Sequence, residues 1–267
     1  MIVGLLSGAL TSTPAFSAAK ATVAPELTGL VSVGHGIAYI FGVVGAVLFV
    51  QIIPKLTKAN MAEERAKLAA ASQQTDKKPV DKLFTIDHFG LAGFSLAAIL
   101  GTLVGQIRIP LSAAGLEGTC FSLTTTGGCL LMSLILGHFG RIGRVKIIPS
   151  PDVLKLFREL GLVLFLVGAG IPGGAEFVAY FDPMYFVYGV VMTVLQLAAG
   201  YLFAKYVLKL SLLNNLGSIT GGRTSTPALG TLIKVAGTED VVTAYAATYP
   251  VALIAVVLIS QFIIIIF

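Results

Sequence analysis

Residues 4–15 read GLLSGALTSTPA, and residues 217–228 read GSITGGRTSTPA. Both stretches contain Gly-x-x-x-Gly followed by Thr-Ser-Thr-Pro-Ala, and an uncharged segment follows each copy. Five consecutive identities and two aligned glycines indicate an internal repeat rather than a chance match of small residues. With a slip of three residues, two further pairs match: Tyr39 with Tyr249, and Gln51 with Gln261.

The proline of each copy predicts a break in a helix. Proline lacks the backbone donor of a helix interior and clashes with the carbonyl four residues back. Inside a bilayer, the freed backbone groups survive only where they are buried in protein or line a cavity. Broken helices at matching positions of two halves indicate a transporter's substrate site, and their half-helix N-termini favour anionic groups. We therefore predict a helix interruption within residues 213–230, near Thr224–Pro227.

The two copies supply the predicted substrate-binding residues, of which the hydroxyls would ligate the substrate and the glycines would admit it. These are Thr11, Ser12, Thr13, Pro14, Gly221, Gly222, Arg223, Thr224, Ser225, Thr226 and Pro227. Arg223 carries the one charge between Ser211 and Ile233, and its planar guanidinium could bind a carboxylate through two hydrogen bonds. Alternatively, Arg223 snorkels from a motif near the interface. The first copy has Leu10 at this position, so any role of the arginine is asymmetric.

The composition is that of an integral membrane protein. Of the 267 residues, 56% are hydrophobic and 12% are charged, whereas soluble domains carry about 25% charged residues. The mean hydropathy is +0.91. The net charge of +5 is better explained by basic cytoplasmic loops than by binding to nucleic acid, which we do not expect as a partner.

Uncharged stretches define the predicted spans of an all-α polytopic fold. They are residues 27–54, 88–107, 118–140, 160–175, 183–204 and 241–267. The fourth is short and extends back through Leu154–Arg158. In contrast, eleven of the 31 residues of 57–87 are charged. We therefore predict three parts: 1–56 as the tail of a first membrane repeat (a broken helix plus one span), 57–87 as a charged cytoplasmic linker, and 88–267 as a second membrane repeat.

Signals for an enzyme, a metal site or a cofactor site are weak. Cys120 and Cys129 lie nine residues apart, a spacing that matches no zinc, haem or redox motif. The Gly-x-Gly-x-x-Gly of residues 168–173 ends a predicted span, and no strand precedes it. Glu117 and Glu159 are the nearest candidates for a proton or sodium site. We predict a non-enzymatic protein without a metal or cofactor.

The duplicated motif resembles that of the aspartate–alanine antiporter family, also described as the YidE/YbjL duplication permeases. Supporting segments are GGCLLMSLILGHFGR (127–141), ELGLVLFLVGAGIPGG (159–174) and YPVALIAVVL (249–258). The resemblance implies a secondary transporter that exchanges or exports small carboxylates or amino acids, such as aspartate, alanine, glutamate or succinate. It also implies inverted repeats with crossed, discontinuous helices, as in cation/proton antiporters.

The sequence departs from the family pattern in two respects. Family members carry regulatory domains, which resemble potassium-channel nucleotide-binding domains, between their halves, where this chain has only the 57–87 linker. Residues 1–56 resemble only the end of a first half. We therefore expect a fragment or a form without the regulatory domains, with any missing helices supplied by a homo-oligomer or another chain. The alternatives are a channel-like pore, and a non-transporting membrane subunit or truncated remnant.

We expect a multi-pass protein of the plasma (inner) membrane that binds a small anionic or zwitterionic substrate. Residues 27–54 run into Lys55, Lys58 and the charged linker, which should be cytoplasmic. Their counterpart, 241–267, ends without charge, as two copies inserted in opposite directions would require. Inversion needs an odd number of crossings after the linker. Residues 88–267 offer six candidate segments, namely the five uncharged stretches after the linker and the motif segment 212–236. One of the six must therefore fail to cross, and we expect segment 212–236 to re-enter the membrane.

We predict that Phe267 lies on the side of the membrane opposite the linker. A cysteine placed after residue 267 and another near Ser72 should react with an impermeant thiol reagent from opposite sides. Equal labelling of both cysteines from one side would instead indicate six full crossings and parallel repeats.

Overall fold

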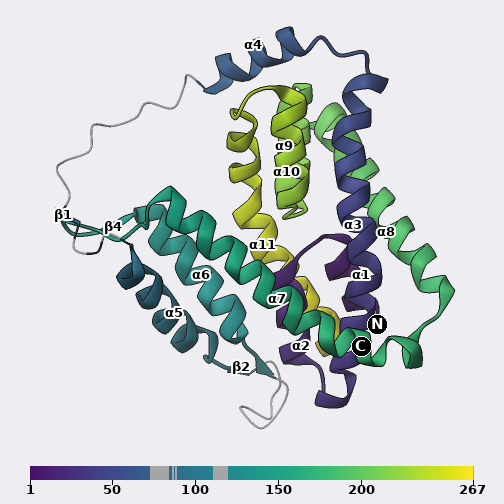
Figure 1. Ribbon diagram of the computed structural model, residues 1–267, viewed down its shortest axis with the longest axis vertical. Coiled ribbons are helices and arrows are strands. Elements are labelled where there is room, and N and C mark those ends of the chain that lie inside the picture. Colours follow the sequence, from purple (N-terminus) through teal and green to yellow (C-terminus); the bar gives the residue numbers. More distant parts are fainter. Residues whose placement is uncertain (73–83, 86, 88, 111–119, 267) are drawn as a thin grey trace.

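The computed structural model is mostly helical and describes residues 1–72, 84–85, 87, 89–110 and 120–266 (Figure 1). Its α-helices are α1 (Ile2–Ala9), α2 (Thr13–Thr22), α3 (Thr28–Leu56), α4 (Met61–Ser72), α5 (Leu91–Gly105), α6 (Thr124–Phe139), α7 (Pro151–Tyr180), α8 (Pro183–Leu202), α9 (Leu212–Gly222), α10 (Thr226–Ala236) and α11 (Val241–Ile266). A 3₁₀-helix, η1 (Pro25–Leu27), precedes α3, and a π-helix, η3 (Phe203–Val207), continues α8.

Short strands, which the sequence did not predict, connect some of these helices. The strands β1 (Phe84–Thr85), β4 (Arg141–Ile142) and β5 (Val145–Lys146) form one small sheet, in which β5 is central. The strands β2 (Ile109–Pro110) and β3 (Cys120–Phe121) form an antiparallel pair. Each strand has only two residues, so the sheets act as connectors between helices.

Three described stretches are long and apolar enough to cross a membrane: Pro25–Leu56, Pro183–Val207 and Val241–Ile266. Each coincides with a span predicted from the uncharged stretches of the sequence. The predicted span 160–175 lies within the longer α7, which begins at Pro151 and ends at Tyr180. Ser150 caps α7 by accepting a hydrogen bond from the Val153 amide.

The two motif copies adopt the same broken-helix conformation. In the first copy α1 ends at Ala9 and α2 begins at Thr13. In the second, α9 ends at Gly222 and α10 begins at Thr226, which confirms the interruption predicted near Thr224–Pro227. The residue before each serine is a threonine with a left-handed backbone: φ is +56° at Thr11 and +55° at Thr224.

Each break forms a hairpin whose two halves return to the same end of the molecule. For α9 and α10 this end is marked by α4: Glu64 accepts a hydrogen bond from the amide of Leu212, where α9 begins. Arg65 donates to the carbonyl of Ala236, where α10 ends. Segment 212–236 is therefore a hairpin, and its re-entry into a membrane stays a prediction.

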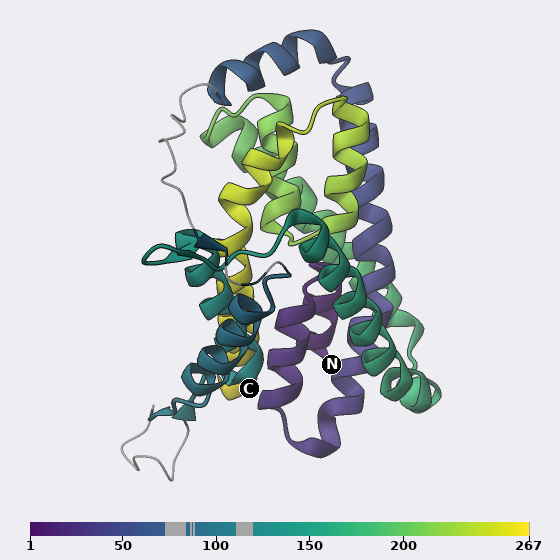
Figure 2. The same ribbon diagram turned by 60° about the vertical axis from the view of Figure 1, so that its left-hand side comes forward.

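The hairpin of α1 and α2 enters from the opposite end of the bundle. Val3 of α1 and Ala19 of α2 share a hydrophobic cluster with Val31, near the start of α3. Ile264 near the end of α11 packs against the same cluster, whereas Val241 at the start of α11 packs with Val50 near the end of α3. The helices α3 and α11 therefore run in opposite directions, and the C-terminal end of α11 lies far from α4 (Figure 2).

The glycines of each motif allow a half-helix to pack closely on the long helix that follows it. A Cβ atom at Gly8 would collide with the carbonyl oxygen of His35 in α3. A Cβ atom at Gly221 would collide with the carbonyl oxygen of Tyr245 in α11. Close approach through small residues is a common way for membrane helices to associate. The repeat thus extends from the backbone of the break to its packing.

Glycines also join α5 to α6 at the side of the bundle. A side chain at Gly101 of α5 would meet the backbone of Cys129 in α6, and one at Gly128 would meet the carbonyl oxygen of Gly101. Gln261 of α11 donates a hydrogen bond of 2.9 Å to the carbonyl of Ser122, which ties the start of α6 to the rest of the bundle.

Helix α4 lies across the end of the bundle and seals its hydrophobic core (Figure 1). Leu68 is 1% exposed and belongs to a cluster with Leu213 of α9, Leu232 of α10 and Val50 of α3. The neighbouring Lys67 is exposed and pairs with Glu64, whose side chain is buried against the bundle, at 2.7 Å. The first part of the linker is therefore a helix docked on the membrane bundle.

Adjacent glycines of the second motif provide a matched test of the packing. Gly221→Ala should lower the melting temperature, because the new methyl group collides with the Tyr245 carbonyl. Gly222→Ala should not lower it, since a Cβ there meets nothing within 4 Å and alanine favours a helix. Heating purified protein and measuring the monodisperse fraction by size exclusion compares the two. Equal melting temperatures would contradict this packing.

The docking of α4 predicts a strong effect of Leu68→Ala. Truncating a buried leucine usually costs about 2–5 kcal/mol, so α4 should detach from the bundle. The measurable result is faster proteolytic cleavage between residues 57 and 87. Leu56→Ala removes the same atoms from a side chain that is 74% exposed, and should leave the cleavage rate unchanged. Cleavage at the same rate in both variants would show that α4 is not anchored through Leu68.

Candidate functional site

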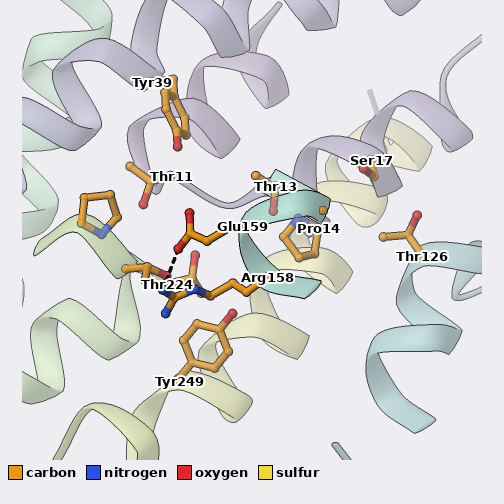
Figure 3. Close-up of a pocket in the computed structure, with 13 residues that line it drawn as sticks. Thr11, Thr13, Pro14, Ser17, Tyr39, Thr126, Arg158, Glu159, Thr224 and Tyr249 are labelled. Carbon is orange, nitrogen blue, oxygen red and sulfur yellow. Dashed lines mark hydrogen bonds and ion pairs between the residues drawn. The ribbon is translucent and has the colours of Figure 1, made fainter. Parts of the chain in front are cut away.

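A pocket lies where the tips of the two hairpins meet. Its volume is about 610 Å³. Thr11 from the first break and Thr224 from the second both line it, and the hydroxyl of Thr11 donates to the carbonyl of Arg223 at 3.3 Å. Helix α7 contributes Arg158 and Glu159 to the lining (Figure 3). Two breaks separated by more than 200 residues in the sequence thus share one cavity.

The structure brings six of the eleven sequence-predicted residues to this pocket. They are Thr11, Thr13, Pro14, Thr224, Thr226 and Pro227. The remaining five, Ser12, Gly221, Gly222, Arg223 and Ser225, are not among its described lining residues. Ser12 caps α2 by accepting a hydrogen bond from the Ala15 amide, and Gly221 packs against α11. These two residues shape the hairpins and do not contact the cavity.

Arg223 holds the two hairpins together. Its guanidinium donates to the carbonyl oxygens of Ala9, Gly42 and Thr193, with nitrogen–oxygen distances of 2.5, 3.2 and 3.3 Å. The side chain is therefore directed into the packing of α1, α3 and α8. Arg223 is 4% exposed, so it does not snorkel toward an interface. Its partners are backbone carbonyls, where the sequence analysis expected a substrate carboxylate.

The start of α10 is suited to an anionic group. Thr226 and Pro227, the first residues of α10, line the pocket, and the preceding Ser225 makes no side-chain capping bond. Thr224 is 7% exposed, and its hydroxyl oxygen has no hydrogen-bond partner among the described residues. The start of a helix concentrates free amide groups and positive potential, which anions neutralise. An acceptor in the pocket could bind both the hydroxyl and these amides.

The left-handed threonines add strain at the same place. A β-branched side chain at positive φ is a genuine conformational outlier and costs on the order of 1–3 kcal/mol. The structure carries this cost at both Thr11 and Thr224, which face the same cavity. Strain of this kind concentrates at ligand sites, where it fixes the direction of a side chain.

Several lining residues were absent from the sequence-based site. They are Ser17, Tyr39, Thr126, Arg158, Glu159, Gly161 and Tyr249. Tyr39 and Tyr249 are a matched pair of the repeat, which was a usable signal. Figure 3 shows them above and below the Arg158–Glu159 pair. No signal in the sequence places α7 beside the motifs, so Arg158 could not have been found.

Of the two acidic residues predicted as candidates for a proton or sodium site, the structure places one. Glu159 lines the cavity, and Glu117 lies outside the described residues. Within the described part of the chain, no group of three or more histidine, cysteine, aspartate or glutamate residues is placed to hold a metal ion.

Comparison with known proteins shows which family the chain resembles. A protein-family model described as "Predicted Permease Membrane Region" matches residues 1–55 and 93–265, and so leaves out the charged linker. An uncharacterized transporter of Bacteroides thetaiotaomicron is 34% identical over 183 residues, which cover 67% of this chain and 33% of that protein. No solved structure matches the chain.

Other relatives show the same partial coverage. An uncharacterized transporter of Desulfotalea psychrophila is 33% identical over 66% of this chain and 32% of its own length. A putative transport protein of Klebsiella pneumoniae is 31% identical over 63% of this chain and 31% of its own length. The chain thus spans about a third of these curated relatives. Because the permease model covers most of its residues, the chain belongs to the aspartate–alanine exchanger family of multi-pass membrane permeases.

Proposed function

We propose that this protein is the part of a secondary transporter that binds and exchanges, or exports, small carboxylates or amino acids. The proposed substrate site is the pocket between the two hairpin tips. One observation carries the proposal: two half-helix N-termini, at Thr13 and Thr226, meet around a single cavity lined by threonine hydroxyls. Half-helix ends that point at an anionic substrate are a recurrent device of such transporters.

The size and polarity of the cavity support a small polar substrate. A volume of about 610 Å³ lies within the range of ligand pockets and accommodates an amino acid with ordered water. Thr11, Thr13, Thr224 and Thr226 provide hydroxyls that can both donate and accept. A carboxylate can bind to the donors, and the remaining hydroxyls can bind a second polar group.

An inverted repeat would explain the arrangement of the helices. The two hairpins enter from opposite ends, and α3 and α11, which follow them, run in opposite directions. The contacts are also exchanged: α2 packs against α11, and α10 packs against α3. A pseudo-twofold axis in the membrane plane, passing near the pocket, relates such copies. Alternating access would then move one copy relative to the other around the substrate.

We place the end that carries α4 in the cytoplasm, in a plasma (inner) membrane. Lys55 and Lys58 follow α3 at this end, and Lys205 and Lys209 precede α9 there. Basic residues flanking spans accumulate on the cytoplasmic side. The outer faces of α7 and α8 are apolar and exposed, including Leu164 and Leu195, and would contact lipid or another copy of the chain.

The proposal predicts coupled exchange in proteoliposomes that contain the purified chain. Vesicles preloaded with aspartate, alanine, glutamate or succinate should take up one of these compounds from outside only when a substrate is inside. A channel-like pore would give uptake that does not depend on the internal substrate. A chain that neither binds nor moves any of the four compounds would refute the proposal.

Removing the pocket hydroxyl of Thr224 should weaken the exchange. Thr224→Val keeps the shape of the side chain and deletes a donor, and a hydrogen bond to a charged group is worth about a tenfold change in affinity. Thr231→Val is the control, because Thr231 lies on α10, bonds to the Pro227 carbonyl and is not among the described lining residues. Equal half-saturation concentrations for the two variants would exclude Thr224 as a ligand.

A further inference from the structure

Helix α7 brings a pair of opposite charges to the pocket. The guanidinium of Arg158 lies 2.7 Å from the carboxylate of Glu159. Among the described lining residues, these two side chains carry the only charges. The residues that follow them on α7, such as Leu160 and Val163, are apolar and exposed. Ionisable side chains that face a cavity within a bundle of membrane helices usually mark a functional site.

The ion pair of Arg158 and Glu159 contributes little to stability. Adjacent residues of a helix point in different directions, so the two side chains must bend toward each other. Both are more than half exposed, at 56% and 61% of the side chain, and exposed ion pairs contribute little to stability. A ligand that offers each charge a better partner can therefore open the pair at small cost.

A zwitterion is the chemical class that fits this pair. The carboxylate of an α-amino acid can pair with Arg158, and its ammonium group can pair with Glu159. The buried hydroxyl of Thr224 and the start of α10 provide further donors for the carboxylate. An acid without an amine brings its negative charge toward Glu159 and has no ammonium group to offset the repulsion, which lowers its affinity.

We propose that Arg158 and Glu159 are the specificity-determining pair of this pocket, and that they select zwitterions over simple anions. Arg158 binds the substrate carboxylate and Glu159 binds the ammonium group, while their own ion pair opens. This inference rests on the proposed function, because it assigns the ligands of the same site. Arg223, which is bonded to three backbone carbonyls, then has no part in charge recognition.

Two matched pairs of ligands test the inference directly. Aspartate and succinate differ by one amino group, and so do alanine and propionate. Isothermal titration calorimetry of the full chain in nanodiscs should give at least about tenfold tighter binding for the amino acid of each pair. Glu159→Gln should weaken the binding of the amino acid and reduce this ratio to within about threefold. Arg158→Gln should weaken the binding of both members.

Two further variants on α7 serve as controls. Lys155→Gln and Asp152→Asn remove charges of each sign from exposed positions, and neither residue is among the described lining residues. Both should bind all four compounds as the parent chain does. Their melting temperatures, compared with those of the Arg158 and Glu159 variants, show whether a loss of binding reflects unfolding.

The outcomes separate this inference from the proposed function. Equal affinities for amino acids and their deaminated analogues in the parent chain would overturn the zwitterion assignment and leave transport of carboxylates in place. An unchanged ratio in Glu159→Gln would also overturn it. If the parent chain binds none of aspartate, succinate, alanine and propionate, and exchanges none of the compounds of the proteoliposome test, the proposed function fails and the inference fails with it.

Discussion

The hydrogen bonds of the broken backbone are the constraint on which the rest of the structure depends. Where a helix stops inside an apolar environment, its last carbonyls and first amides need partners. In both copies the chain meets this need in the same way. The amide of Ser12 bonds to the Ser7 carbonyl, and that of Ser225 bonds to the Thr220 carbonyl. This turn requires the left-handed threonine before each serine, and it directs that threonine into the shared pocket.

Arg223 supplies hydrogen-bond donors across the two halves of the chain. Its guanidinium reaches a carbonyl at the first break and carbonyls of two helices packed beside it. Ala9 ends α1, and its carbonyl has no partner within the helix. A buried guanidinium needs partners for its donors. Three carbonyls bind its Nη1 and Nη2 atoms, and its buried Nε has no partner among the described residues. Leu10, the matching residue of the first copy, cannot play this part. The difference between Leu10 and Arg223 in the two motif copies therefore means that only the second copy bonds to the first through a side chain at this position.

Local features of the fold could be predicted from the sequence, whereas features that depend on distant segments could not. The proline and glycines of residues 217–228 were sufficient to locate the break, because a missing backbone donor and two residues of low helix propensity coincide there. Pro54 and Pro250 lie inside α3 and α11, so a proline alone does not end a helix in this chain. Thr224 and Thr226 followed from the same motif. The partners of Arg223 come from three other helices, and the position of Arg158 depends on how α7 lies over the bundle. No pattern along the chain records either contact.

Helix α4 of the linker is connected to the pocket through the hairpin of α9 and α10. Glu64 and Arg65 hold the two open ends of the hairpin formed by α9 and α10, and the tip of this hairpin lines the pocket. Leu68 packs between the same two helices, so α4 is fixed to the hairpin by both polar and apolar contacts. A short helical hairpin is stiff along its axis, since its length is set by hydrogen bonds in each half. Because α4 contacts both open ends of this hairpin, a movement of α4 along the hairpin axis would also move the tip, and with it Thr224 and Thr226.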